Sequence, residues 1–221
     1  MQPILIFSLT ASLGSMGELA GHERRGTLNW PARSALIGLM GAALGIRRDG
    51  DFSALDALDI TVGIYDSGVH VRDYHTIETV PSASVKLPNS RPEALRAARR
   101  RTNTTITLRD YRAAPLYGVA VTGPGLTKLA QALNAPGFTL YLGRKSCPLA
   151  APPSARVVEA AGAASALSQL ILPPWRTDVR LVNLIVDDPM GEVVHDLPTD
   201  RARWHFSSRR VSVQPVVEKS G

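Results

Sequence analysis

A chain of 221 residues is long enough for one large or two small domains, and 44% hydrophobic residues are sufficient to bury a core, which excludes a disordered tail. The formal net charge of +6 favours a polyanionic partner over a small acidic metabolite. Cys147 is the only cysteine, so an internal disulfide is excluded, and no Cys/His cluster has metal-ligand spacing. We therefore expect no metal or other cofactor and a reducing, cytoplasmic environment.

The first predicted element is a strand. Residues 4–9 are apolar and rich in β-branched side chains. The stretch superficially resembles a secretory signal, but it lacks a cationic start and an A-x-A cleavage site. No run in the chain reaches the roughly 20 apolar residues that span a bilayer, so we expect no membrane segment.

A polar stretch over residues 12–29 predicts a long loop, and a helix should follow over residues 32–44 with Gly45 as its stop. Ser34, Gly38, Gly41 and Gly45 gather on one face of this helix. Either the sheet or RNA is expected to approach that face closely. Arg33 and Ser34 lie near the helix N-terminus, where unpaired N–H groups favour an anion.

Residues 60–65 predict a second strand, and a turn at 66–68 leads into a short strand at 69–71. A polar insertion over residues 72–115 follows. Between residues 86 and 112 it contains two acids and eight cations, a difference equal to the net charge of the chain. The cations are Lys86, Arg91, Arg96, Arg99, Arg100, Arg101, Arg109 and Arg112. The alternatives are a nucleic-acid-binding arm, which we favour, and a solvated arginine-rich loop.

The pattern then returns to a strand at 116–122, a helix with four apolar residues on one face, and a strand at 138–142. The four apolar residues are Leu126, Leu129, Ala130 and Leu133. The order strand, helix, strand, insertion, strand, helix, strand predicts an α+β fold with a ferredoxin-like, RRM-like domain over residues 1–149. Residues 150–221 form a C-terminal extension, with an alanine-rich helix between prolines and strands at 179–186 and 211–217.

Two short segments carry the candidate chemistry. In LYLGRKSCPL (140–149), Gly143 allows a sharp turn, and Arg144 and Lys145 then project from a strand end where a phosphate would fit. In RDYHT (72–76), a cation, an aromatic ring and an imidazole suit stacking and hydrogen bonding to unpaired bases, although they suit a packed loop equally well.

These two segments and PARSALIGLMGAALGI (31–46) occur in the order found in the Cas5 family of CRISPR-associated proteins. The chain resembles that family, and within it the CasD subunits of type I-E Cascade complexes. The resemblance implies a non-catalytic antiviral-defence subunit that holds and caps the 5′ handle of a CRISPR RNA. Its implied partners are the CRISPR RNA, a CasC-type backbone subunit, a CasA-type large subunit and, through the complex, target DNA.

The resemblance also implies that the insertion is a β-hairpin thumb, whose far arm matches Arg109 and Tyr111 here, and that Arg33 and Ser34 contact phosphates. The full set of residues that we expect to bind RNA is Arg33, Ser34, Arg72, Tyr74, His75, Arg109, Tyr111, Arg144 and Lys145. Two departures stand out. The chain has Arg112-Ala113-Ala114-Pro115 where the family commonly continues with an acid, and Ser15-Met16-Gly17 where the family has Ala-Trp-Gly. We therefore expect a local ion pair and a stacking aromatic to be missing.

Two other functions remain open. A metal-independent endoribonuclease that cleaves repeat RNA needs a base and a cation. Candidate groups are His22, Tyr74, His75, Lys86 and Lys145, but no shared spacing fixes two of them together. The other alternative is a pure assembly protein whose basic insertion docks on an acidic partner and contacts RNA little.

Overall fold

The computed structural model describes residues 1–18, 23–81, 83, 85, 90–201, 203 and 205–216. Its centre is a six-stranded sheet in which every neighbouring pair is antiparallel. In spatial order the strands are β10 (His205–Pro215), β9 (Asn183–Asp200), β4 (Asp59–Asp66), β7 (Leu116–Thr122), β1 (Gln2–Thr10) and β8 (Arg156–Ala160). Strands from the beginning, middle and end of the chain therefore share one sheet.

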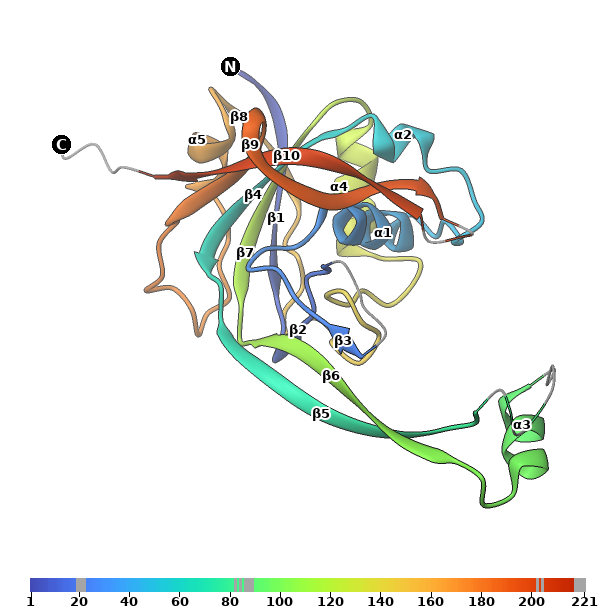
Figure 1. Cartoon of the computed structure of the whole chain (residues 1–221). Helices are drawn as coiled ribbons and strands as arrows, with labels where there is room; N and C mark the ends of the chain where they lie inside the picture. The colour runs from blue at the N-terminus through green and yellow to red at the C-terminus, as the bar shows by residue number, and fades with distance from the viewer. Residues whose placement is uncertain are drawn as a thin grey trace.

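Helices cover both faces of this sheet (Figure 1). Alternate residues of β1 point to opposite sides: Leu5 and Phe7 belong to the main core, whereas Ile4 and Ile6 belong to a smaller cluster with Leu167. The main core is covered by α1 (Arg33–Ala43) and α4 (Leu126–Asn134), which pack against each other. The smaller cluster is covered by α5 (Ala163–Leu167). A short helix, α2 (Ser53–Asp56), leads into β4.

Several sequence predictions are confirmed. The strands expected at 4–9, 60–65 and 116–122 are β1, β4 and β7, and the helix expected at 32–44 is α1, after which Gly45 has a φ of 73°. The four apolar residues that predicted α4 are all buried. The α+β class follows directly from these elements.

Two predictions about the later chain are wrong. Residues 138–142 contain only an isolated bridge between Tyr141 and Pro148, because the backbone N–H groups of Gly137 and Phe138 bind the terminal carbonyl groups of α1 and hold the chain away from the sheet. The place beside β1 is taken by β8. The alanine-rich stretch is therefore a strand followed by the five-residue α5, rather than one helix.

The strands expected at 179–186 and 211–217 only overlap β9, which begins at residue 183, and β10, which ends at residue 215; the observed strands are longer, with 18 and 11 residues. Residues 217–221 lie outside the described part of the chain. Because β8, β9 and β10 belong to the same sheet as β1, the extension continues that sheet. A division at residue 149 stays a prediction.

A long hairpin extends from one end of the sheet (Figure 1). It pairs β5 (Val69–Thr79) with β6 (Asn103–Ala113) in one continuous register, and α3 (Arg91–Ala98) lies between the two strands. Two strands of two residues each, β2 (Leu13–Gly14) and β3 (Arg24–Arg25), pair with the body end of β6. The expected short strand at 69–71 is thus the start of an eleven-residue strand, and the predicted loop at 12–29 helps to hold the hairpin.

Among the described residues, no helix is long and apolar enough to cross a membrane.

Candidate nucleic-acid interface

The residues predicted to bind RNA concentrate where the hairpin joins the body. We call this region the hairpin root: residues 69–75 of β5, residues 107–113 of β6, and the loop 143–147 beside them. Antiparallel pairing places directly opposite residues on the same side of the hairpin. Arg72 is opposite Asp110, and Val71 is opposite Tyr111. The root therefore has an Asp110 side and a Tyr111 side.

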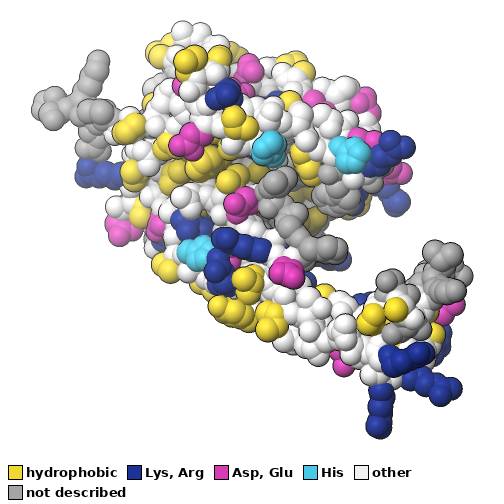
Figure 2. Space-filling model, in the orientation of Figure 1, with side chains coloured by type: hydrophobic (Ala, Val, Ile, Leu, Met, Phe, Trp, Pro, Cys, Tyr) yellow, Lys and Arg dark blue, Asp and Glu magenta, His cyan; other side chains and the backbone are white. Residues whose placement is uncertain are grey.

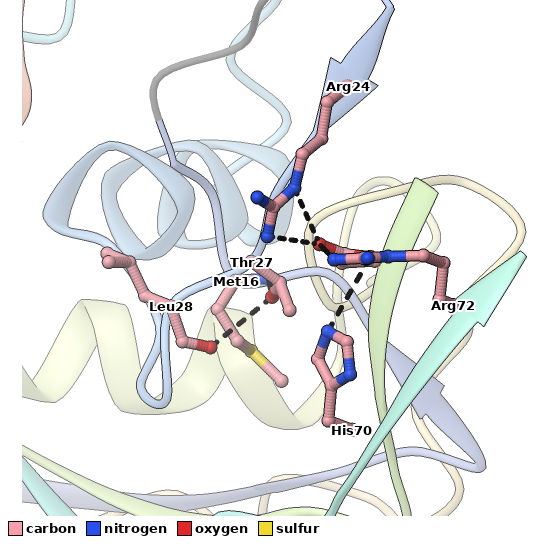
Figure 3. Close-up of polar contacts among 7 residues, drawn as sticks. Met16, Arg24, Thr27, Leu28, His70 and Arg72 are labelled. Atoms are coloured by element: carbon pink, nitrogen blue, oxygen red, sulfur yellow. Dashed lines mark hydrogen bonds and ion pairs between the residues drawn. The ribbon is translucent and has the colours of Figure 1, made fainter. Parts of the chain in front are cut away.

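On the Asp110 side, a buried carboxylate binds two arginines (Figure 3). Arg72 donates from Nε at 2.8 Å and from Nη2 at 3.2 Å, and Arg24 donates from Nε and Nη2 at 3.2 and 3.1 Å. Nε2 of His70 lies 3.5 Å from the same carboxylate. The hydrogen bond from Arg72 is the main reason why the pKa of Asp110 lies well below its usual range; burial opposes this effect and Arg24 adds to it.

These contacts connect three strands, because Arg24 comes from β3, Arg72 from β5 and Asp110 from β6. The carboxylate fixes the hairpin to the first loop of the body. Arg72 was expected to contact bases, but its guanidinium is bound to Asp110, so it holds the root together instead. Sequence reasoning missed Asp110, although a single acid within a basic, strand-forming stretch is a signal for such an ion pair.

On the Tyr111 side, a cation lies over an aromatic ring: Cζ of Arg144 is 4.7 Å from the centre of the Tyr111 ring. Arg144 reaches this position because Gly143 turns the chain with a φ of +83°, in direct contact with the backbone of Ser15. The turn is closed by a 2.8 Å hydrogen bond from the N–H of Cys147 to the carbonyl of Arg144. Glycine is required because a Cβ at position 143 would overlap the Ser15 carbonyl oxygen.

Two guanidinium groups on this side have unmet hydrogen-bonding capacity. Arg109 is two residues before Tyr111 on the same strand, so its side chain projects on the same side. Nε of Arg109 and Nη1 of Arg144 are buried and have no hydrogen-bond partner in the part of the chain that the structure describes. Buried donors without acceptors are costly, so an acceptor supplied from outside would stabilise this arrangement.

Comparisons with known proteins agree with this architecture. The family model described as CRISPR-associated protein (Cas_Cas5) matches residues 4–212. The chain is 32% identical over 169 residues to the CRISPR system Cascade subunit CasD of Escherichia coli (strain K12), which covers 69% of this chain and 70% of the relative. The chain belongs to the Cas5 family.

Two solved structures have the same Cas5 fold. One is titled "CRISPR RNA-guided surveillance complex", with a TM-score of 0.70 and 27% identity over 96% of this chain and 89% of the other. The second is titled "Crystal structure of Cas protein", with a TM-score of 0.63 and 26% identity, covering 96% and 94% of the two chains. Because the matches extend over nearly the whole chain, β8, β9 and β10 are part of the shared fold.

The other residues predicted for the hairpin lie along its strands. Tyr74 is 70% exposed. It lies on the Asp110 side, two residues after Arg72 in the direction of the far end of the hairpin. His75 projects on the Tyr111 side, where its Nδ1 lies 4.0 Å from Asp73. Lys145 is exposed next to Arg144. The Tyr111 side thus carries His75, Arg109 and Tyr111 along its two strands, with Arg144 stacked on Tyr111 from the loop that also contains Lys145.

Arg33 is not on this surface, which corrects the sequence prediction. Its side chain is buried, and its Nη2 donates to the carbonyl oxygens of Asp56 and Leu58 at 2.9 and 2.7 Å. Its backbone N–H binds the Asp196 carboxylate at 2.7 Å. Arg33 therefore anchors α1 within the body and is unavailable for a phosphate, while Ser34 beside it is half-buried.

The small face of α1 is used for packing at one position. A Cβ at Gly41 would overlap the ring of Phe52, whereas a Cβ at Gly38 would meet no heavy atom within 4 Å. At Gly41 the group that packs closely against α1 is therefore the ring of Phe52 from the same chain.

The structure shows what Arg112 and Met16 do at the two positions where the sequence departs from the family pattern. Arg112 donates from Nε to the Ser67 carbonyl at 2.8 Å and from Nη2 to the Ser67 hydroxyl at 3.0 Å, so it fixes the turn before β5. Met16 is fully buried, and its backbone N–H binds the Thr27 hydroxyl at 2.8 Å (Figure 3). Met16 therefore packs inside the body and offers no aromatic ring at the surface.

Two of the described groups considered for RNA cleavage lie on different sides of the hairpin. Tyr74 and His75 project on opposite sides of the hairpin, since they are consecutive on a strand. His22 and Lys86 lie outside the described residues. The described part of the chain also contains no group of three or more His, Cys, Asp or Glu side chains that could hold a metal ion.

Proposed function

We propose that this Cas5 chain is a non-catalytic RNA-binding subunit of a CRISPR Cascade surveillance complex, and that it holds and caps the 5′ handle of the guide RNA. Support comes from the family match, from the similarity to CasD, and from the structural likeness to a chain of an RNA-guided surveillance complex. Its proposed partners are the CRISPR RNA, a CasC-type backbone subunit, a CasA-type large subunit and target DNA reached through the complex.

The observation that carries the proposal is the Tyr111 side of the root. It combines an aromatic ring, a cation stacked on that ring and two buried guanidinium N–H groups without acceptors in the described chain. Stacking of unpaired bases on aromatic rings and guanidinium planes is a common basis of single-stranded RNA recognition. Phosphate oxygens and base edges are the acceptors that arginine donors bind best.

Within this site we assign different roles to different residues. Arg144 and Lys145 bind phosphates, while Tyr74, His75, Arg109 and Tyr111 engage unpaired bases. Phosphate contacts fix the register of the RNA, and base contacts select the repeat-derived handle. Ser34 is kept as a secondary phosphate contact; Arg33 and Arg72 are left out because their guanidinium groups are bound inside the protein.

We also assign the core a ferredoxin-like fold and the hairpin the role of a thumb. The strand order β4-β7-β1-β8, with α1 after β1 and α4 after β7, supports the first assignment. The hairpin's projection from the body at a basic root supports the second (Figures 1 and 2).

The test uses the purified full chain and end-labelled repeat RNA without divalent metal, with each mixture run on native and denaturing gels. The proposal expects a shift that depends on the handle sequence, with the RNA intact. A discrete cleavage product would support an endoribonuclease instead. If neither shift nor cleavage occurs, even with a CasC-type subunit added, the chain is an assembly protein.

A salt titration sharpens the assignment. For single strands, each neutralised phosphate contributes about −0.7 to the slope of log K against log salt. Replacing Arg144 and Lys145 by alanine should therefore reduce the slope by about 1.4. The matched control is R47A/K128A, which removes two exposed cations from the body. An unchanged slope in the double variant would remove Arg144 and Lys145 from the phosphate site.

A further inference from the structure

The far end of the hairpin carries a second basic cluster (Figure 2). We call residues 90–101 the hairpin tip; it comprises α3 and the residues on either side of it. Five arginines in this segment are exposed, and Glu93 is its only acid. The exposed arginines are Arg91, Arg96, Arg99, Arg100 and Arg101. The tip therefore concentrates positive charge far from the body.

Most of this charge has no partner within the described chain. Arg91 donates to the Glu78 carbonyl at 2.6 Å. The guanidinium groups of the other four arginines form no hydrogen bond or ion pair with any residue that the structure describes. Such a density of like charge opposes compact folding, and Arg99 additionally has a φ of 56° that non-glycine residues rarely adopt. Both the repulsion between like charges and the unfavourable φ of Arg99 lower stability, and such features are typically kept at functional sites.

The tip is nevertheless a built structure. The Ser90 side chain caps α3 by accepting from the N–H of Glu93 at 3.4 Å, and Pro92 lies in the first turn. Ala94 and Ala98 are buried on one face of the helix. The arginines are thus presented outward by a capped helix and the turn that follows it.

The tip and the root are electrostatically separate. Thr79 follows Arg72 by seven positions along β5, which at about 3.3 Å per residue corresponds to about 23 Å. The Debye length at physiological ionic strength is about 8 Å, so charges at the tip act independently of charges at the root. A ligand of the tip must therefore make its own contacts there.

The chemistry of the tip also differs from that of the root. Residues 90–101 contain no aromatic residue and no histidine, so they lack the aromatic stacking surface that the root offers to unpaired bases. Arginine guanidinium groups match phosphate oxygens in bidentate geometry. We propose that the hairpin tip is a second site, which binds the phosphodiester backbone of a nucleic-acid duplex without reading its sequence. This site is distinct from the handle site and does not depend on it.

The test compares two double variants of the full chain that lose the same charge. The tip variant is R100Q/R101Q, and the control is R47Q/K128Q, which removes two exposed cations from the body. Fluorescence anisotropy measures binding to DNA and RNA duplexes of about 20 base pairs with mixed sequence, over a range of salt concentrations. Thermal unfolding confirms that both variants fold.

For B-DNA each phosphate contact contributes about −0.9 to the salt slope, so the tip variant should reduce the slope by about 1.8 and the duplex affinity by about tenfold. The control should change neither. A larger loss on the DNA duplex would identify target DNA as the ligand, and a larger loss on the RNA duplex would identify a folded part of the guide RNA. The proposal is overturned if the wild-type chain binds neither duplex at low salt, or if the tip variant and the control behave alike.

Binding of single-stranded handle RNA is measured in the same series. The tip variant should change handle affinity by less than about twofold, because the two sites are screened from each other. Equal loss on handle and duplex would refute a separate tip site. If the wild-type chain fails to select the handle but binds duplexes through the tip, the proposed function fails while the tip site stands.

Discussion

The root and the tip of the hairpin are both rich in arginine, but they use it differently. At the root, Arg24 and Arg72 share the buried Asp110 and Arg112 binds Ser67, while Arg109 and Arg144 each keep one buried donor without an acceptor among the described residues. At the tip, four of five arginines have no partner among the described residues. The number of arginines in a segment therefore says little about its role. Whether each guanidinium is already bound decides whether it builds the protein or awaits a ligand.

The largest expected effect comes from changing the turn that positions Arg144. Gly143→Ala should destabilise the protein by about 3 kcal/mol, because its φ of +83° is strained for alanine and the new Cβ overlaps the Ser15 carbonyl. Thermal unfolding should show a decrease of about 9 °C in Tm.

The matched control is Gly38→Ala in α1, where a Cβ meets no heavy atom within 4 Å. Alanine is the better helix former, so this change should be neutral or stabilise by up to about 1 kcal/mol. Equal Tm values for the two variants would show that the loop at Gly143 adapts freely, and the root would then be no more constrained than the tip.

A smaller effect is expected from the ion pairs of the root. Asp110→Asn should destabilise the protein by about 2 kcal/mol at pH 7, since it leaves Arg24 and Arg72 without their carboxylate; the loss is moderated because both arginines are partly exposed to water. Urea unfolding measures the difference, with Asp178→Asn in an exposed loop as the control.

The same variant predicts a pH dependence. Because the pKa of Asp110 is depressed in the folded state, its contribution is fully present above the unfolded pKa of about 3.9 and is lost as the pH falls toward the lower folded value. The stability difference between wild type and Asp110→Asn should therefore be constant from pH 7 to about pH 5 and shrink below about pH 4. A difference that stays constant down to pH 3 would exclude the ion pairs as its cause.

The smallest effect is expected at the tip. Arg99→Gly should stabilise α3 by about 1 kcal/mol, because the φ of 56° and ψ of −114° suit glycine. Hydrogen exchange of the α3 amides should slow by about fivefold. Arg100→Gly removes the same charge without a positive φ and should not slow exchange. Faster exchange in both variants would show that the arginines stabilise the tip.

The sequence predicted the elements whose signals are local. The apolar run of β1 and the helical spacing of Leu126, Leu129, Ala130 and Leu133 each specify an element without help from distant residues. The strand predicted at 138–142 is wrong because hydrogen bonds to Ala42 and Ala43, nearly a hundred residues earlier, redirect the backbone. Hydrogen bonds to residues so far away in the sequence leave no periodic pattern in residues 138–142 from which they could be predicted.

The candidate site was predictable to a similar extent. Arg144 was identified from its glycine turn, a local feature that the structure confirms. Arg33 was misassigned because Asp196, which binds its backbone, is 163 residues away along the chain. The stacking of Arg144 on Tyr111 joins a loop and a strand that no sequence spacing relates.

The continuous register of β5 and β6 makes the hairpin a long two-stranded arm that is attached to the body at one end only. Its eleven paired positions correspond to about 36 Å, so a rotation of 10° at the root displaces the far end by about 6 Å. That displacement is close to the spacing of neighbouring phosphates along a nucleic-acid strand. Asp110 belongs to the fourth pair from the body end, and its ion pairs to β3 and β5 restrict this rotation and so fix the position of the far end.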